Sequence, residues 1–184
     1  MMESLAQIAL RLNKQEIRWG LGASLLLNLY GLESTPGDID IFVDLADADK
    51  AKKVLSQLGE EQTVTKRAPY ATKIFSKYAI NGIGVDMMAG FQICHGHGRY
   101  QYLLNEEAIV AKEWIFGERI PLTALEDWFI LYQLIPGRME KAERIENYFT
   151  AKGIRYPERL QRALEEELPP LVRTKAARLL TSDL

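Results

Sequence analysis

"GASLLLNLYGLESTPGDIDIFVD", residues 22–44, is the stretch that decides the fold predicted for this chain. Its last part, "DIDIFVD", alternates polar and apolar residues, which is typical of a strand with one buried face. Residues two apart in a strand point to the same face, so Asp38 and Asp40 project together while the isoleucine between them points into the core. The earlier part, "SLLLNLYGL", predicts a helix with Ser24 as its N-cap.

The paired carboxylates of Asp38 and Asp40 need a physical explanation. They repel each other, and their charge is costly where water is limited. A divalent cation removes that cost, and Mg²⁺ binds through a few carboxylates together with phosphate oxygens and water. A solvated strand end with acids beside a turn is the simpler explanation of this pair taken alone.

A glycine-rich turn precedes the predicted helix in "WGLGASLLL", residues 19–27. The backbone N–H groups of such a turn, together with the helix N-terminus, attract phosphate. Gly22 lets the backbone approach a ligand closely, and Ser24 can donate its hydroxyl. An ordinary strand-to-helix turn is the simpler explanation of this stretch taken alone.

A third acid lies in "NGIGVDMMAG", residues 81–90, where Asp86 interrupts a predicted apolar strand. An acid among apolar strand residues usually has a partner or a function. On a strand beside Asp38 and Asp40, its carboxylate could complete a site for two metal ions.

These three features together resemble the nucleotidyltransferase superfamily, which has the polymerase-beta-like fold. Its members carry a glycine turn into a helix, a D-x-[D/E] pair on the next strand and a third acid on a later strand. The matching positions here are Gly22, Ser24, Asp38, Asp40 and Asp86. The resemblance covers residues 18–89.

The C-terminal part of the chain is also similar to this superfamily. Residues 121–149, "PLTALEDWFILYQLIPGRMEKAERIENYF", resemble a helical segment of small bacterial members. The resemblance therefore implies an α/β fold with two parts. A mixed sheet flanked by helices would occupy residues 1–121, and a C-terminal helical segment residues 122–184.

The resemblance implies a metal-dependent enzyme that moves a nucleoside monophosphate from a nucleoside triphosphate such as ATP to a hydroxyl acceptor. Two Mg²⁺ ions are the implied cofactors. Asp38 and Asp40 would bind the ion that bridges the triphosphate, and Asp40 and Asp86 would bind the second ion. Asp86 would also receive the acceptor's proton. Gly22 and Ser24 would hold the terminal phosphates.

Basic residues must offset the remaining phosphate charge in such an enzyme. Lys73, Arg138 and Lys141 are the candidates for nucleotide binding, with solvated surface charge as the alternative for each. Two positions depart from the superfamily pattern, because Ser34 and Gln133 stand where an arginine and a lysine are common. These departures favour a second hypothesis, a catalytically lapsed nucleotide-binding or protein-interaction module. A plain α/β protein with incidental acids is the third.

Bulk composition sets broader limits. The chain has 184 residues, 47% of them hydrophobic, and a formal net charge of -2, as expected for a globular protein. Its one cysteine, Cys94, cannot form an internal disulfide, which suits a reducing compartment. We expect a cytoplasmic protein without a membrane partner. The acceptor is left open between a small molecule, RNA and a protein, although the acidic charge disfavours tRNA. A homodimer is also left open.

Periodicity and turn residues predict the remaining elements. We expect helices at 4–15, 24–32, 47–60, 123–135, 138–153, 157–168 and 169–180, and strands at 16–22, 38–44, 72–80, 84–91, 99–104 and 108–122. Thr123 and Glu126 match a capping box, and Pro157, Pro169 and Pro170 mark helix starts. The segment "CHGHG", residues 94–98, predicts a flexible loop rather than a zinc site.

Overall fold

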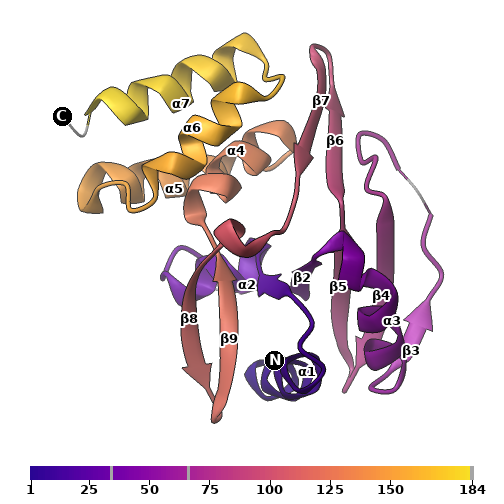
Figure 1. The fold of residues 1–184 in the computed structure, drawn as a ribbon. Helices are drawn as coiled ribbons and strands as arrows, with labels where there is room; N and C mark the ends of the chain where they lie inside the picture. The colour runs from indigo at the N-terminus through magenta and orange to yellow at the C-terminus, as the bar shows by residue number, and fades with distance from the viewer. Residues whose placement is uncertain (34, 66, 183–184) are drawn as a thin grey trace. The chain divides into compact units, whose positions relative to one another are not determined.

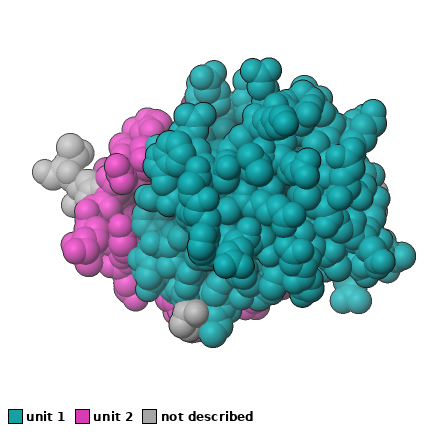
Figure 2. Space-filling view, turned by 90° about the horizontal axis from the view of Figure 1, so that it is seen from below, with its two compact units in different colours: residues 1–67, 72–91, 102–123 teal, residues 68–71, 92–101, 124–184 magenta. Residues whose placement is uncertain are grey.

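The computed structural model describes residues 1–33, 35–65 and 67–182 of the chain. It contains two compact units, which Figure 2 colours separately. Unit 1 comprises Met1–Arg67, Thr72–Phe91 and Tyr102–Thr123; unit 2 comprises Ala68–Ala71, Gln92–Gln101 and Ala124–Leu184.

Unit 1 is built on a seven-stranded mixed sheet with the strand order β3-β4-β5-β2-β1-β9-β8 (Figure 1). Its strands are β1 (Trp19–Leu21), β2 (Ile39–Val43), β3 (Glu60–Gln62), β4 (Ile74–Ile80), β5 (Ile83–Ala89), β8 (Ile109–Ile115) and β9 (Glu118–Thr123). The pairs β2–β5 and β1–β9 are parallel, and the other neighbouring pairs are antiparallel. The predicted α/β class with a mixed sheet is confirmed.

The helices of unit 1 are α1 (Met2–Lys14), α2 (Ala23–Leu29) and α3 (Ala48–Ser56), with short 3₁₀ turns η1 (Leu45–Asp47) and η2 (Glu106–Ala108). Helices α1 and α3 contact each other and the sheet. They cover the face that carries Ile39, Ile41, Tyr78, Val85 and Met87, all fully buried. The opposite face therefore carries the residues that alternate with these, including the acids of β2 and β5.

The hairpin β4–β5 turns at Asn81 and Gly82, whose φ angles of 52° and 75° are both positive. Such a two-residue turn matches the twist of the flanking strands and favours Asn-Gly. The hairpin predicted from this dipeptide is confirmed. Its register pairs Ile80 with Ile83 and places every residue of β4 opposite a defined residue of β5.

Unit 2 contains the hairpin of β6 (Phe91–His95) and β7 (Gly98–Tyr102), whose outer ends, Phe91 and Tyr102, belong to unit 1. Its helices are α4 (Leu125–Leu134), α5 (Met139–Lys152), α6 (Pro157–Glu165) and α7 (Pro170–Ser182). Pro157 and Pro170 are the first residues of their helices, as predicted. No helix in the described part of the chain is both long and apolar enough to cross a bilayer.

A buried ion pair connects α4 to α6 within unit 2. Arg159 donates through Nε to both carboxylate oxygens of Asp127 at 3.1 Å, and its Nη2 lies 2.9 Å from Oδ2. Both side chains are almost fully buried. Burial raises the pKa of Asp127 to about 6, although Arg159 acts in the opposite direction.

Two predicted helix caps are wrong. Helix α2 begins at Ala23 with Gly22 as its N-cap, so Ser24 lies inside the first turn. Thr123 ends β9 and donates its hydroxyl to the Leu21 carbonyl at 2.8 Å, while α4 has Ala124 as its N-cap. In each case a contact or turn from the sheet replaces the local cap.

Glu126, the other half of the predicted capping box, has a different role. Its carboxylate accepts the backbone N–H groups of Arg155 and Tyr156, at 3.0 and 2.9 Å, where the chain enters α6. Strands β3 and β6 were not expected, and the loop predicted at residues 94–98 is shorter than expected, because residues 94–95 belong to β6 and Gly98 begins β7.

Candidate metal centre

A row of residues crosses three neighbouring strands of the unit 1 sheet, β4, β5 and β2, and reaches Gly22, the residue after β1. Asp40 of β2 pairs with Asp86 of β5, and Asp86 pairs with Lys77 of β4 on its other side. On the far side of Asp40, its carbonyl accepts the N–H of Gly22 at 3.0 Å. Directly opposite residues in a sheet share a face, so the side chains of Lys77, Asp86 and Asp40 project together.

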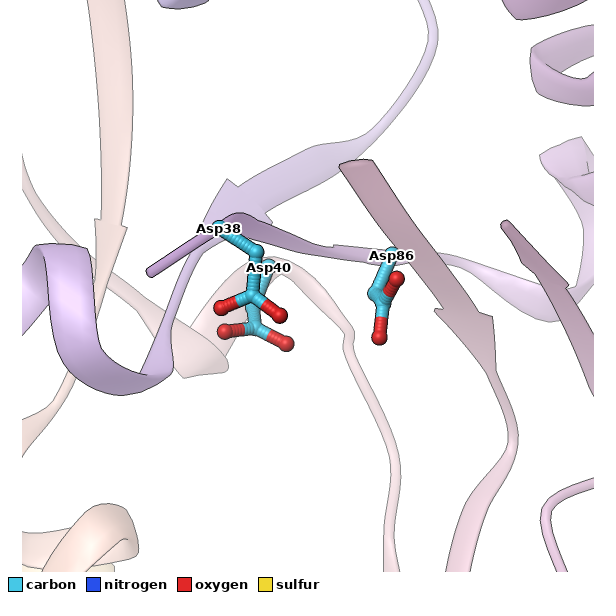
Figure 3. A group of neighbouring side chains, drawn as sticks. All are labelled: Asp38, Asp40 and Asp86. Carbon is cyan, nitrogen blue, oxygen red and sulfur yellow. The ribbon is translucent and has the colours of Figure 1, made fainter. Parts of the chain in front are cut away.

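Three carboxylates converge at this row. Asp38, Asp40 and Asp86 each offer an oxygen, and these oxygens all lie within 4.8 Å of one another. Figure 3 shows that the three carboxyl groups point to the same side, two from β2 and its approach and one from β5. Among the described residues, no other group of three or more His, Cys, Asp or Glu residues is arranged in this way.

Gly84 leaves space beside this cluster. A Cβ atom built on Gly84 would lie 3.6 Å from the Cβ of Asp38, which is ordinary contact for one methyl group. Any longer side chain there would extend toward the carboxylate of Asp38. Asp38 therefore lies diagonally across from Asp86, at the end of the cluster away from Lys77.

Lys77 forms an ion pair with the third acid. Its Nζ lies 2.8 Å from Oδ1 of Asp86 and donates a hydrogen bond to Oδ2 at 3.2 Å. The side chain of Asp86 is 14% exposed and that of Lys77 is 42% exposed. The close approach to Oδ1 is ionic rather than directional, because that buried oxygen has no hydrogen-bond partner among the described residues.

The surroundings of this pair raise the pKa of both Asp86 and Lys77. Burial raises the pKa of Asp86 above its ordinary value; the hydrogen bond and charge of Lys77 oppose this effect, and the charge of Asp38 adds to it. The hydrogen bond to Asp86 is the main reason that the pKa of Lys77 is raised as well. The raised pKa makes Asp86 a stronger base than an ordinary aspartate.

The cluster fits a hard divalent cation. Mg²⁺ and Ca²⁺ take oxygen ligands at about 2.0 to 2.6 Å, so ligands of one ion lie up to roughly 4 to 5 Å apart. The three carboxylates satisfy this limit, and Oδ1 of Asp86, the oxygen 2.8 Å from the Lys77 ammonium, is already in contact with a cation. A bound cation would also relieve the repulsion between neighbouring carboxylates.

The glycine turn lies beside the row. Gly22 is extended, with φ of -135°, and its N–H is engaged by Asp40. Ala23 follows with φ of 51°, a left-handed conformation that non-glycine residues adopt at a cost. The first N–H groups of a helix have no partner within the helix; here the first intrahelical donor is Leu26, which bonds to Gly22, so the N–H groups of Ala23, Ser24 and Leu25 precede the helical ladder.

The three basic residues predicted to bind the nucleotide are not part of this row. Lys73 directly precedes β4 and is four residues from Lys77, on the same face. In an extended strand this separation is about 13 Å. The N–H of Lys73 donates to the Gly90 carbonyl. Arg138 and Lys141 belong to unit 2, where Arg138 is the N-cap of α5 and Lys141 lies 5.7 Å from the Tyr132 ring centre. Their roles in nucleotide binding stay predictions.

The structure describes only one of the two positions that depart from the superfamily pattern. Ser34 lies outside the described residues. Gln133, in α4, donates to the carbonyl of Phe129 in the preceding turn at 3.1 Å.

Lys77 is the residue that the sequence prediction missed. The signal was present in the Asn81-Gly82 turn, because counting outward from a two-residue turn places Lys77 directly opposite Asp86.

The histidine segment has a structural role within unit 2. His95 donates through Nε2 to the carbonyl of Glu167 at 3.1 Å, and its Nδ1 accepts the N–H of His97. Both ring nitrogens are therefore occupied by protein groups. The expectation that this segment is a loop rather than a zinc site stays a prediction as far as the metal is concerned.

No protein-family model matches the chain, and no curated protein matches it. Solved structures do match. The protein TM1012 of Thermotoga maritima, provisionally assigned as a nucleotidyltransferase, aligns over 82% of this chain and 92% of its own with 24% identity and a TM-score of 0.59. The antibiotic-resistance factor ANT(2'')-Ia aligns over 98% of this chain and 93% of its own, with 10% identity and a TM-score of 0.57.

A third structure, the lincosamide antibiotic adenylyltransferase LnuA, aligns over 78% of this chain and 95% of its own, with 12% identity and a TM-score of 0.51. Identities this low show a shared fold. The fold expected from the order of the glycine turn and the three acids is thereby confirmed.

Proposed function

We propose that this chain, which has the fold of the nucleotidyltransferase superfamily, transfers a nucleoside monophosphate from a nucleoside triphosphate to a hydroxyl acceptor. The observation that carries the proposal is the convergence of Asp38, Asp40 and Asp86 within 4.8 Å on one face of the sheet. The fold alone would not support an activity, since related folds serve many functions.

Divalent cations, with two Mg²⁺ ions as the expectation, are the proposed cofactors. Asp38 and Asp40 would hold one ion, and Asp40 and Asp86 the other. Bound there, the ions would neutralise triphosphate charge and make the acceptor hydroxyl more acidic.

Asp86 is the proposed general base. The acceptor oxygen would form a bond to the α-phosphorus, the bond from that phosphorus to the oxygen bridging to the β-phosphorus would break, and pyrophosphate would leave. The acceptor's proton would pass to the carboxylate of Asp86. Burial supports this role because a raised pKa brings a carboxylate closer to the value that suits a base at neutral pH.

The glycine turn is the proposed phosphate contact. With the Gly22 N–H held by Asp40, Gly22 would contribute close backbone approach, and Ser24 its hydroxyl and N–H. Lys73, Arg138 and Lys141 are proposed to offset the remaining phosphate charge. ATP is the nucleotide we would try first.

A small molecule is the acceptor class we favour. ANT(2'')-Ia is known in complex with adenylyl-2''-tobramycin, and LnuA with bound lincomycin. Two proteins of this fold therefore bind an antibiotic or its adenylylated form. RNA and protein acceptors are the other outcomes of the test below.

A nucleotide-binding module without catalysis is the second candidate. The observation in its favour is the ion pair of Lys77 with Asp86, which engages the proposed base. Such a module would bind the nucleotide and never transfer it, and this difference from the first candidate can be measured.

The experiment is to incubate the purified chain with α-³²P-labelled nucleoside triphosphates, Mg²⁺ and a cell extract separated into small-molecule, RNA and protein fractions. Label moving to one fraction with Mg²⁺, and staying in the nucleotide with EDTA, supports the enzyme. Binding of nucleotide by calorimetry without any transfer supports the module. The absence of both contradicts the proposed function.

A further inference from the structure

Lys77 is fixed opposite Asp86 by the register of the hairpin and not by a flexible surface contact. The two residues are Cα partners in an antiparallel pair whose two-residue turn permits one register. The ammonium lies 2.8 and 3.2 Å from the two oxygens of Asp86. It therefore contacts the same carboxylate that the second cation of the centre would need.

The positive charge of Lys77 acts on all three carboxylates of the cluster. Its ammonium interacts electrostatically with Asp38 and Asp40 as well as with Asp86. Three carboxylates and one ammonium leave a local charge that one divalent cation would balance. A second divalent cation would have to compete with the ammonium for Asp86 and would be repelled by it at short range.

The centre is asymmetric as a result. Asp38 lies opposite Gly84, at the end of the cluster away from Lys77. Asp86 forms the other end and already has a cation beside it. A surface ion pair without function is the competing explanation, but such a pair would not need to lie within the carboxylate cluster.

On the basis of the proposed function, we propose that Lys77 is a positioning residue that competes with the second divalent cation for Asp86. The centre then binds its first cation at Asp38 and Asp40 and its second cation much more weakly. The triphosphate, which brings negative charge of its own, favours entry of the second cation, so that the complete centre assembles with the nucleotide and not before it.

The test is a Mn²⁺ titration of the intact chain without nucleotide, with free Mn²⁺ counted by electron paramagnetic resonance. The wild type is expected to bind one Mn²⁺ at least tenfold more tightly than a second. In Lys77→Met, which keeps most of the length of the side chain and removes its charge, the second Mn²⁺ should bind about tenfold more tightly than in the wild type. Lys77→Arg should retain the wild-type separation.

Lys52→Met is the matched control. Lys52 also pairs with an acid of the sheet, Glu61, at 3.6 Å, and it is exposed to a similar extent. It belongs to α3, which packs on the other face of the sheet. This variant should bind Mn²⁺ as the wild type does. If Lys77→Met does not fold, Lys77→Gln provides the same loss of charge, and far-ultraviolet circular dichroism checks both.

The outcomes are distinct. Equal Mn²⁺ stoichiometry and affinities in the wild type and in the variants that remove the charge of Lys77 would overturn this inference and leave the proposed function standing. Two equally tight ions in the wild type would do the same. No Mn²⁺ binding in any of the proteins would overturn the metal-dependent function and this inference together.

Discussion

Asp40 and Asp86 are direct partners in the parallel pair of β2 and β5, although 45 residues separate them in the chain. This pairing brings the third acid to the D-x-D pair. A slip of one residue in either strand would turn one of the two carboxylates to the opposite face, against α1 and α3. The register of this one strand pair is therefore the condition on which the candidate centre depends.

Asp38→Asn and Asp40→Asn are each expected to abolish Mg²⁺-dependent nucleotide binding without unfolding the chain. Each change removes a charged ligand and keeps the shape of a half-exposed side chain. Isothermal titration with Mg²⁺ and nucleotide measures the binding, and thermal unfolding checks the fold. Asp49→Asn, an exposed acid of α3, is the matched control and should bind as the wild type does. Unchanged heats in both cluster variants would contradict a role for these carboxylates.

Asp86→Asn is expected to lower the rate of nucleotide transfer by about 100-fold or more, the range for loss of a general base. Binding of nucleotide should fall much less, because Asp38 and Asp40 remain. Single-turnover transfer of labelled nucleotide separates the two effects. A rate within tenfold of the wild type would assign the proton to another acceptor.

Ala23→Gly is expected to stabilise the chain by about 1 kcal/mol, because glycine adopts the left-handed conformation at 51° without a Cβ penalty. Urea unfolding measures the free energy. Ala177→Gly, at an exposed position in the interior of α7, should have the opposite sign and cost about 1 kcal/mol. A loss of stability in Ala23→Gly would show that the strain is absent in solution.

The buried pair of Asp127 and Arg159 predicts a strong mutational coupling. Arg159→Met alone should cost about 3 to 5 kcal/mol, because it leaves a buried carboxylate without its partner. The double variant Asp127→Leu, Arg159→Met should recover part of this loss, since no buried charge remains. A double-mutant cycle by urea unfolding measures the coupling, and additive losses would contradict it.

Asp127 also predicts a pH dependence of stability. Its folded pKa of about 6 lies above the ordinary value of 3.8, so the folded state binds this proton more tightly than the unfolded state. The stabilising contribution is present below about pH 4 and is lost as the pH rises to about 6, by up to roughly 3 kcal/mol.

The comparison with Asp127→Asn isolates this contribution. The difference in unfolding free energy between the wild type and Asp127→Asn should decrease as the pH is raised from 4 to 6, and stay level from 6 to 8. A difference that grows with pH over the lower interval would show that Arg159 outweighs burial and holds the pKa of Asp127 down.

Local patterns predicted most of the elements because their causes are local. The alternation in residues 38–44 gives β2, the Asn81-Gly82 turn gives the β4–β5 hairpin, and prolines open α6 and α7. Strand β3, with the sequence Glu60-Glu61-Gln62, was missed because its residues carry no strand signal. It forms because β4 offers it a free edge.

In the candidate centre too, local patterns determined some features and the packing of the whole sheet determined others. The sequence alone places Asp38 and Asp40 on one side of a strand, and the turn beside Asn81 places Lys77 opposite Asp86, because side chains alternate along a strand and a two-residue turn sets the register of a hairpin. Which strand lies next to which is decided by the burial of whole faces across the sheet. Only the tertiary structure therefore placed β5 beside β2, brought Asp86 to Asp40, and moved Thr123 from a helix cap to the carbonyl of Leu21.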